Sequence, residues 1–343
     1  MEFPEFTFLT VGRGTDPRTA RNLSRNFAAG RLVRLRRGVY IPIEEWLGTT
    51  SWGRYAASTA SLGLPGPAPV FCRETALSLH GFSLARVPLT VEYLTDSLSN
   101  WGRRPSPRLY GDMPAAAKAW GRIQPDTRTV LPPGFRDARR PGAERKPTRL
   151  SVAHLGVVLP LQRLEAVLLD TLHRMAFPDA VVIVDAIAAR DPRIKSPCSL
   201  EGLAASLAGL PSRAARDRTA KVLRFADPAA ESVGESISRA VIEQLGFEVP
   251  ESQFRVMGPC GEVARTDFYW RSRKLVGEFD GIMKYSRSRE FSGKDPAQVV
   301  VEEKVREDRI RAEGYQVVRW VWGELMKPEL LRGKLLRAGV PRR

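Results

Sequence analysis

Cysteine is scarce in this chain of 343 residues, and the three cysteines, Cys72, Cys198 and Cys260, lie far apart. No two of them form a CxxC pair. The sequence therefore predicts neither a zinc site built on thiolates nor a framework of disulfides. Because disulfide-poor chains are typical of reducing compartments, we expect a cytoplasmic protein.

Long hydrophobic runs are also missing. No apolar segment reaches the roughly 18 residues that a membrane-spanning helix requires. The opening residues, MEFPEFTFLT, lack a basic segment followed by an apolar one, so we expect no signal peptide. A chain of this length is expected to form about two or three domains.

Acidic residues are outnumbered, with 38 Asp and Glu against 54 Lys and Arg, which gives a formal net charge of +16. Arginine binds phosphate through two parallel hydrogen bonds, so the charge favours a nucleic-acid partner. A genome rich in G and C, which favours arginine codons, is the alternative explanation. No long basic amphipathic helix stands out, which disfavours an anionic membrane as the partner.

Residues 15–45 are expected to form a helix, a turn, a second helix and a short hairpin. Thr15 or Asp16 is the expected helix cap, with Pro17 at the first helical position. Gly30 is expected to end the helix. A helical unit followed by a basic hairpin is typical of a winged helix-turn-helix.

The hairpin LVRLRRGVYIP alternates apolar and basic side chains, which would let Arg34, Arg36 and Arg37 contact phosphates. A solvated basic face on a small structural cap is the alternative. The run AAGRLVRLRRGVYIP resembles the N-terminal winged-helix domain of AbiEi-type antitoxins and related transcriptional regulators. The segment VFCRETALSLHGFSLARVPLTVEYLT resembles the part that follows in that family, and LQRLEAVLLDTLHRM resembles its closing helix.

This first resemblance covers about residues 15–190. It implies a helix over Arg73–His80 and a strand over Leu89–Leu94. His80 is expected to terminate its helix rather than act in catalysis. Residues 97–150 are expected to be mostly irregular, and 191–228 should form two short helices that connect to the last domain.

The segment EVARTDFYWRSRKLVGEFDGIMKY carries the chemistry of the C-terminal region. It is expected to form two strands, with Asp267 on the first and Glu278 and Asp280 on the second. Alternation along a strand places Glu278 and Asp280 on one face, where Asp267 can join them. Three converging carboxylates favour a bound hard cation such as Mg²⁺. A solvated hairpin with ordinary surface acids is the alternative.

The elements around this hairpin follow the order helix, strand, strand, helix, strand. Glu235 lies three residues after Ser232, which is a capping-box spacing and predicts a role at the helix start. Val299–Gly314 is expected to be a charged helix. Gln316–Trp322 is almost continuously apolar, which predicts a buried strand parallel to the one before it.

This order resembles the restriction-endonuclease-like PD-(D/E)xK nuclease superfamily, in particular the short domains related to very-short-patch-repair endonucleases. The resemblance covers about residues 230–325. It matches Glu235 to the family's helix acid, Asp267 to its strand acid, and Glu278 with Asp280 to its Glu-x-Asp-Gly motif. The Lys that gives the superfamily its name is replaced here by Asp280.

The resemblance implies hydrolysis of phosphodiester bonds with Mg²⁺ or Mn²⁺ held by Asp267, Glu278 and Asp280, with Glu235 in or next to the site. A cationic residue must then come from elsewhere, and Lys284 and Lys304 are the two candidates. The tryptophans on these strands are expected to be core residues. The basic residues expected to hold the phosphate backbone are Arg271, Arg273, Lys274, Arg287 and Arg289.

The sequence thus predicts a multi-domain α/β protein. We expect a winged helix-turn-helix over 1–48, an α+β domain over 49–190, a helical connector over 191–228 and a restriction-endonuclease-like α/β/α core over 229–343. The expected function is a metal-dependent DNA endonuclease in phage or mobile-element defence. The alternative is a non-catalytic DNA-binding regulator or antitoxin of a toxin-antitoxin system. DNA is the expected partner, and the chain is a candidate homodimer.

Overall fold

The computed structural model describes the chain except residues 13, 65, 98, 100, 104–107, 124–129, 260 and 282–295, and except the side chains of 296–300. It is a mixed α/β structure with several small sheets. It divides into two compact units. The first comprises Met1–Thr171 with Pro192–Cys198, and the second comprises Leu172–Asp191 with Ser199–Arg343. Each unit is described by itself.

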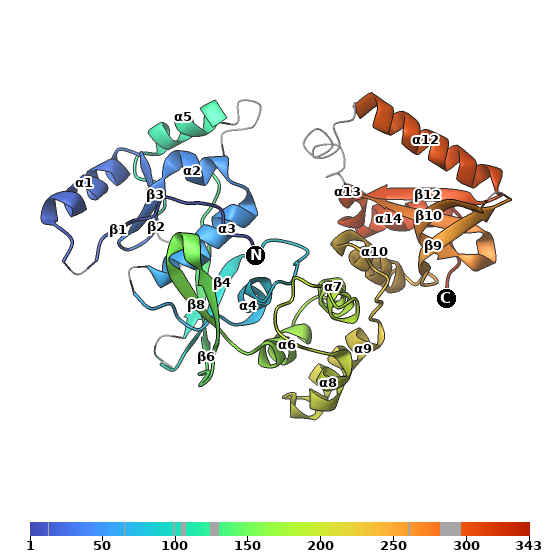
Figure 1. Cartoon of the computed structure of the whole chain (residues 1–343), viewed down its shortest axis with the longest axis horizontal. Coiled ribbons are helices and arrows are strands. Elements are labelled where there is room, and N and C mark those ends of the chain that lie inside the picture. The colour runs from blue at the N-terminus through green and yellow to red at the C-terminus, as the bar shows by residue number, and fades with distance from the viewer. Residues whose placement is uncertain are drawn as a thin grey trace. The chain divides into compact units, whose positions relative to one another are not determined.

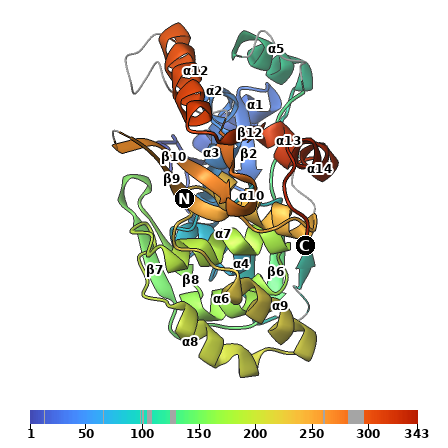
Figure 2. The same cartoon turned by 90° about the vertical axis from the view of Figure 1, so that its right-hand side faces the viewer.

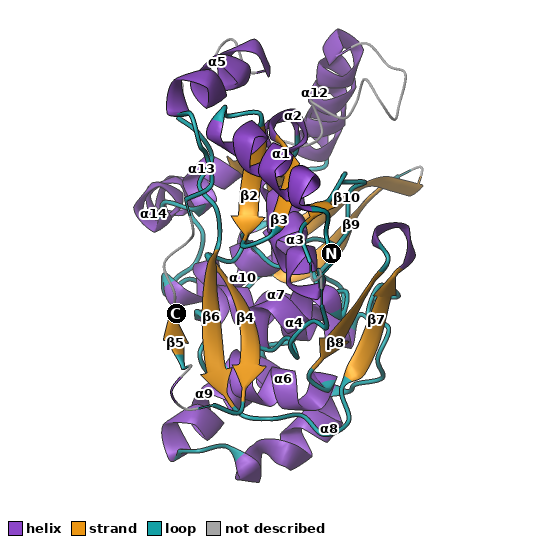
Figure 3. Ribbon diagram, turned by 90° about the vertical axis from the view of Figure 1, so that its left-hand side faces the viewer, coloured by secondary structure: helices purple, strands orange, loops and turns teal. Residues whose placement is uncertain are grey.

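Near its N-terminus the first unit has a capped helix, α1, that lies on a three-stranded sheet. Asp16 accepts a hydrogen bond from the Thr19 backbone N–H, and Pro17 occupies the first turn, as the sequence predicts. Leu23 is buried against Leu32 and Tyr40, which attaches the helix to the sheet β1-β3-β2. Figures 1 and 3 show α1 on this sheet.

The prediction of a second helix before the hairpin is wrong. One helix, α1 (Pro17–Ala28), lies between residue 15 and the hairpin strands β2 (Leu32–Arg36) and β3 (Val39–Pro42). Gly30 has a φ of 71°, a left-handed conformation that ends α1 and turns the chain directly into β2.

A core cluster of the first unit joins β2, β3, α2, α3 and α5 around Trp46 and Tyr110, whose side chains share a 2.7 Å hydrogen bond. A helix, α5, occupies Met113–Ile123, where the sequence analysis expected irregular structure. His80 ends α4, as predicted, and its ring is buried with Nε2 2.9 Å from the Gln162 carbonyl oxygen. Figure 3 shows β6 between β4 and β5, with the hairpin β7–β8 beside them.

The elements of this part of the chain are β1 (Leu9–Thr10), α1, β2, β3, α2 (Ile43–Gly48), α3 (Ser51–Ala60), α4 (Arg73–Leu79), β4 (Thr90–Thr95), β5 (Gly102–Arg103), α5, β6 (Arg136–Pro141), β7 (Thr148–Val152), β8 (Val157–Leu161) and α6 (Leu164–Leu172).

The second unit is built on a four-stranded sheet in the order β12-β11-β10-β9. The two strands predicted around the acidic residues are confirmed as β10 (Gly261–Trp270) and β11 (Leu275–Asp280), and they pair antiparallel. β11 and β12 (Gln316–Val321) pair parallel, with α12 (Pro296–Ala312) as the crossover. The predicted strand–helix–strand unit is therefore confirmed.

Helices cover both faces of this sheet, as Figure 1 shows for α10 and α12. On the α10 face, Trp320 is fully buried, stacks on Phe268 and donates a 2.8 Å hydrogen bond to Ser238 Oγ. On the α12 face, Ile310 is fully buried in a cluster with Tyr269 and Val276. This packing fixes which strand residues face which helix. The prediction that Trp270, Trp320 and Trp322 are core residues is confirmed for Trp270 and Trp320, which are fully buried, whereas Trp322 is only partly buried.

The prediction that Gln316–Trp322 forms a buried strand is wrong in one respect. β12 is an edge strand, and burial alternates along it, with Val318 and Trp320 buried and Arg319 only partly so. An apolar run does not distinguish an inner strand from an edge strand, because the apolar side chains of an edge strand can also pack against a helix that covers the sheet. Trp322 begins the short helix α13.

The helix α7, which the sequence analysis placed in the middle domain, belongs to the second unit and packs on α10. Asp185 on α7 and Arg239 on α10 form a buried ion pair, with Arg239 Nη2 2.8 Å and 3.0 Å from the two carboxylate oxygens. Figure 2 shows α7 beside α10.

The elements of the second unit are α7 (Phe177–Ala188), α8 (Leu200–Ala205), α9 (Arg213–Arg224), α10 (Val233–Gln244), β9 (Glu251–Gly258), β10, β11, α12, β12, α13 (Trp322–Leu325) and α14 (Pro328–Arg337). Among the described residues of the whole chain, none of the helices combines the length and the apolar character that spanning a membrane would require.

Candidate active site on the sheet of the second unit

Three predicted acidic residues share the α12 face of the sheet. Val276 packs against α12, so the period of two along β11 puts Glu278 and Asp280 on the same face. Tyr269 contacts the same cluster, which puts Asp267 on this face of the neighbouring strand β10. The alternation predicted from the sequence therefore brings these acids to one side of the sheet.

Glu278 is the most buried of these acids, with 7% of its side chain exposed. Arg306 on α12 donates a 2.9 Å hydrogen bond to Glu278 Oε1 and a 2.6 Å hydrogen bond to the Arg265 carbonyl oxygen. Burial raises the pKa of the Glu278 carboxyl above its ordinary value, while the hydrogen bond and the charge of Arg306 act in the opposite direction.

The other two acids have different partners. Asp267 Oδ2 accepts a 2.8 Å hydrogen bond from the Phe279 backbone N–H, which ties β10 to β11 beyond their last paired residues. Asp280 Oδ2 lies 3.9 Å from Arg319 Nη1. Arg319 on β12 also pairs with Glu303 at 3.1 Å and with Glu307 at 3.2 Å, so it links the end of β11 to α12.

Among the described residues, carboxylates outnumber guanidinium groups in the cluster between α12 and strands β10, β11 and β12. Five carboxylates lie there with three guanidinium groups, a formal difference of two charges. The low exposure of Glu278 strengthens the field that these charges produce. A surface of this kind attracts cations and repels a bare phosphate group. The residues counted are Asp267, Glu278, Asp280, Glu303 and Glu307 against Arg306, Arg311 and Arg319.

Glu235 lies on α10, which covers the other face of the sheet. Its carboxylate accepts hydrogen bonds from Ser232 Oγ at 2.7 Å and from the Glu231 backbone N–H at 3.0 Å, while its own N–H donates to Ser232 Oγ. The predicted role at the helix start is therefore confirmed. The carboxylate also accepts a 2.8 Å hydrogen bond from Gln253 Nε2.

Gln253 is a residue that the sequence analysis missed. It has a φ of 56°, in the left-handed region that side chains other than glycine rarely adopt. The register of β9 and β10 is the same on both sides of it, with Phe254 opposite Thr266 and Ser252 opposite Phe268, so Gln253 lies opposite Asp267 with no inserted residue. In this conformation the Gln253 side chain reaches Glu235, and no pattern in the sequence indicates the left-handed backbone.

Of the two lysines expected to provide a cationic side chain, the structure describes only Lys304. Lys304 is exposed on α12, whereas Glu303, Arg306 and Glu307 lie nearer the sheet. Lys284 lies outside the described residues. Among the described residues, Arg306 contacts Glu278 and Arg319 lies close to Asp280, and the sequence analysis missed both arginines. The spacing of Glu303, Arg306, Glu307 and Ile310 on one helix face could have indicated Arg306.

The basic residues expected to contact nucleic acid also differ in their surroundings. The Arg36 guanidinium is hydrogen-bonded inside the first unit, where it donates to Ser61 Oγ, the Ser58 carbonyl oxygen and Asp137. Arg34 lies over the Phe27 ring and Arg37 is exposed.

In the turn of the second unit, Arg271 makes two 2.9 Å hydrogen bonds to Glu251. Arg273 and Lys274 are exposed in the same turn. Arg287 and Arg289 lie outside the described residues.

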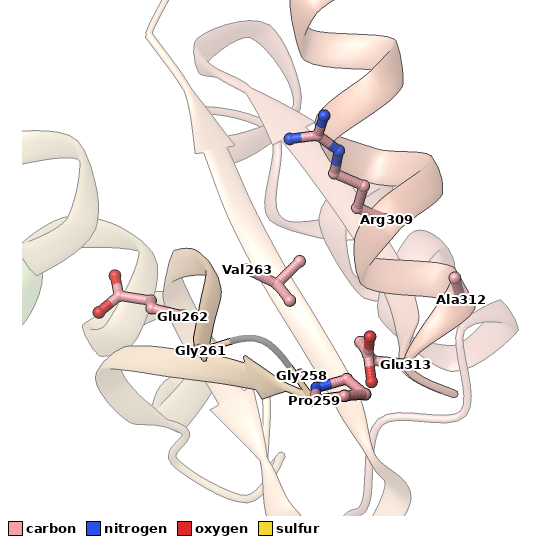
Figure 4. Close-up of a pocket in the computed structure, with 8 residues that line it drawn as sticks. All are labelled: Gly258, Pro259, Gly261, Glu262, Val263, Arg309, Ala312 and Glu313. Atoms are coloured by element: carbon pink, nitrogen blue, oxygen red, sulfur yellow. The ribbon is translucent and has the colours of Figure 1, made fainter.

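A hollow of about 310 Å³ lies between the β9–β10 turn and the end of α12. Figure 4 shows Glu313 beside Gly258 and Pro259, with the Glu262 carboxylate pointing away from it. Glu262 is paired with Arg255 at 3.0 Å instead. The hollow is separate from the acids described above and contains none of the predicted site residues.

The acids on the α12 face can be tested for fit to a divalent cation. Within the part of the chain that the structure describes, no three His, Cys, Asp or Glu side chains are grouped closely enough to enclose a metal ion. Mg²⁺ commonly uses only one or two carboxylates and completes its shell with water and phosphate oxygens. Asp267 and Glu278 fit this open kind of site, whereas a closed cage of protein ligands does not fit.

The fold and this site define a mixed α/β protein with a carboxylate cluster on a helix-covered sheet. The chain is similar to two uncharacterized proteins of Mycobacterium tuberculosis, MT2308 and Rv2248. Each is 30% identical to it over 150 residues, which cover 41% of this chain and 54% of the relative. The chain thus spans about half the length of the curated relatives it matches. No family model and no solved structure matches the chain.

Proposed function

We propose that the chain is a metal-dependent DNA endonuclease whose active site lies on the α12 face of β10 and β11. The observation that carries the proposal is the position of Asp267, Glu278 and Asp280 on one face of two paired strands. The order of elements and acids that resembles the PD-(D/E)xK superfamily supports it. In this proposal Asp267 and Glu278 hold Mg²⁺ or Mn²⁺, and Asp280 lies next to them.

The protein's own residues have clear tasks in this proposal. The excess negative charge of the acids favours cation binding before the DNA backbone can approach. A bound cation supplies an activated water molecule and neutralises charge on the phosphate. Arg306 and Arg319 orient the carboxylates through their ion pairs, and either guanidinium can stabilise negative charge on the scissile phosphate.

A non-catalytic DNA-binding regulator is the second candidate, and a specific observation favours it. The guanidinium of Arg306 occupies the Glu278 carboxylate, and Arg319 lies close to Asp280. In this alternative the arginines replace the metal and stabilise the acidic face. The nuclease-like sheet then serves as a scaffold, and the basic surface of the chain binds DNA.

Nicking of supercoiled plasmid with Mg²⁺ or Mn²⁺ separates the two candidates. The native chain should nick the plasmid, and Asp267→Asn and Glu278→Gln should each abolish nicking. Glu262→Gln is the matched control, because Glu262 is an acid of the same sheet that is paired with Arg255 away from the cluster. Nicking that survives both site substitutions excludes this site.

A second readout does not depend on cleavage. Mg²⁺ or Mn²⁺ should raise the melting temperature of the native chain and of Glu262→Gln, but not that of Asp267→Asn. Salt-sensitive DNA binding without nicking, and without a shift in melting temperature, supports the regulator.

A further inference from the structure

Gln253 lies in β9, an edge strand of the second unit, with a backbone that strand pairing does not require. Its φ is 56°, although its neighbours Ser252 and Phe254 keep one unbroken register with β10. A positive φ is unfavourable for a residue with a side chain, and residues held in such conformations concentrate at functional sites. The left-handed backbone in the middle of this strand therefore points to a role for the Gln253 side chain.

The hydrogen bond of Gln253 shows what the left-handed backbone achieves. Directly opposite residues of an antiparallel pair normally share one face, so an extended Gln253 would lie beside Asp267 on the α12 face. Its Nε2 instead donates a 2.8 Å hydrogen bond to Glu235 Oε2 on α10, the helix that covers the other face. The side chain thus connects the strand position opposite Asp267 to a carboxylate of α10.

The start of α10 does not need this hydrogen bond. The Glu235 carboxylate accepts from Ser232 Oγ and from the Glu231 N–H, while Ser232 Oγ accepts from the Glu235 N–H. These contacts cap the helix without any residue of β9. A carboxylate offers about four acceptor positions, so Glu235 accepts Gln253 without giving up its cap. Gln253 therefore adds a constraint on the Glu235 carboxylate that capping does not require.

A second route joins the start of α10 to Asp267. Gly234 lies so close to Phe279 that an added Cβ atom would overlap the ring, and the Phe279 N–H donates the 2.8 Å hydrogen bond to Asp267 Oδ2. Among the described residues, no three acids are grouped closely enough to enclose an ion. Glu235 would therefore act on a cation held at Asp267 through its charge or through water.

We propose that Gln253 is a positioning residue of the active site proposed above, and this inference rests on that function. Its hydrogen bond fixes the Glu235 carboxylate at the strand position opposite Asp267. There the negative charge of Glu235 strengthens the binding of Mg²⁺ or Mn²⁺ by Asp267 and Glu278. Residues that orient a metal site from outside its ligands typically account for about 10- to 100-fold of the metal affinity.

The test is thermal unfolding of the full-length chain over a series of Mn²⁺ concentrations. Gln253→Gly removes the amide, and glycine adopts a φ of 56° without strain. The Mn²⁺ concentration needed for a given rise in melting temperature should increase at least about tenfold. The melting temperature without metal should change little, because the lost hydrogen bond and the relieved strain have opposite effects.

Ser252→Ala is the matched control, since Ser252 is the neighbouring residue of β9 and donates a 2.7 Å hydrogen bond to Asp227. It should lower the melting temperature without metal and leave the Mn²⁺ requirement unchanged. If Ser252→Ala raises the requirement as much as Gln253→Gly does, the order of the whole edge strand matters and the positioning role is excluded. Should Gln253→Gly lose its native circular dichroism, Gln253→Asn replaces it, because asparagine tolerates a left-handed backbone and is one methylene shorter.

A Glu235→Gln background tests whether Gln253 acts through Glu235. Glutamine keeps the helix cap, so in this background Gln253→Gly should change the Mn²⁺ requirement by less than about twofold. Independent effects of the two substitutions overturn the proposal.

Two further outcomes separate this proposal from the proposed function. If Gln253→Gly responds to Mn²⁺ as the native chain does, the left-handed residue serves only to keep other strands from pairing with the edge of the sheet, and the positioning role alone is wrong. If the native chain neither responds to Mn²⁺ nor nicks plasmid, the proposed function is wrong and the positioning role falls with it.

Discussion

The Arg306 guanidinium on α12 donates a 2.9 Å hydrogen bond to the Glu278 carboxylate on the inner strand β11. Burial of such a pair removes water from both charges, and the attraction between them compensates for this loss only in part. The contact therefore has two consequences. It opposes the rise that burial causes in the pKa of Glu278, and it holds the charged face of α12 against the sheet.

The pH dependence of stability should report the raised pKa of Glu278. A carboxyl whose pKa is higher in the folded chain than in the unfolded chain binds more protons when folded. Its contribution to stability is present at low pH and is lost as the pH rises from the ordinary carboxyl pKa through the raised one.

The free energy of unfolding of the native chain minus that of Glu278→Gln should therefore decrease as the pH rises through this window. Urea unfolding at a series of pH values measures it. Arg306→Met should move the window to higher pH, because it removes the charge that favours ionised Glu278. Arg311→Met is the control, since Arg311 pairs with Glu307 at the surface. A difference that increases with pH contradicts the prediction.

The sequence predicts the acidic face of the sheet because this face depends on local pattern alone. Alternation puts Glu278 and Asp280 on one side of β11, and a short turn brings Asp267 alongside. The partners of these acids depend on how α12 crosses the sheet. Arg306 reaches Glu278 across 28 positions of the chain, and periodicity does not specify that contact.

The wrong predictions for α5 and β12 also arise because local pattern does not specify what packs against a segment. A helix over Met113–Ile123 has few apolar residues beyond alanine, so its pattern is weak, yet Ala116 and Ala119 are buried in the core around Trp46. Burial of small residues is set by what packs against them. Likewise, the apolar run of β12 reflects the burial of this strand under α10 and does not indicate that β12 lies at the edge of the sheet.

Asp185 should be among the residues of the second unit whose loss is most destabilising. Its carboxylate is 2% exposed and accepts hydrogen bonds from Arg239 and from the Asp227 backbone N–H. Asp185→Ala leaves Arg239 buried, with Asp227 at 3.7 Å. We expect a loss of about 3–5 kcal/mol in urea unfolding.

The exposed pair of Arg271 and Glu251 provides the comparison, and Glu251→Ala should destabilise the chain far less than Asp185→Ala. Asp185→Leu combined with Arg239→Met removes both charges and should be less destabilising than Asp185→Ala alone. If the double variant is the less stable of the two, the buried charge is not the cause.

Gly234 allows α10 to approach the sheet. A Cβ atom at this position would overlap the Phe279 ring, so any side chain pushes α10 away from β11. Gly234→Ala should therefore lower stability by about 1–3 kcal/mol, although alanine is the better helix former. Phe279→Leu in the same chain should recover part of the loss.

Gly121→Ala on α5 is the control for this substitution, since nothing lies within 4 Å of the added atom. It should be neutral or should stabilise the chain by up to about 1 kcal/mol. Thermal unfolding measures both variants. A neutral Gly234→Ala means that α10 is not held against Phe279.

Although Arg36 and Arg37 are adjacent in the hairpin, substitution of Arg36 should lower stability, whereas substitution of Arg37 should not. Arg36 pairs with Asp137 at 3.0 Å, with 20% of each side chain exposed, so Arg36→Gln leaves Asp137 without its ion-pair partner. We expect a loss of about 1–3 kcal/mol of stability, measured by urea unfolding.

Arg37 is exposed, so Arg37→Gln should leave stability unchanged. If the hairpin contacts the DNA backbone, the slope of log affinity against log salt should fall by about 0.9 for this variant, measured by anisotropy in chelator. Arg136→Gln, at an exposed arginine of β6, is the control for the loss of one charge. An unchanged slope for Arg37→Gln, in a chain whose native form binds DNA, removes Arg37 from the DNA-binding surface.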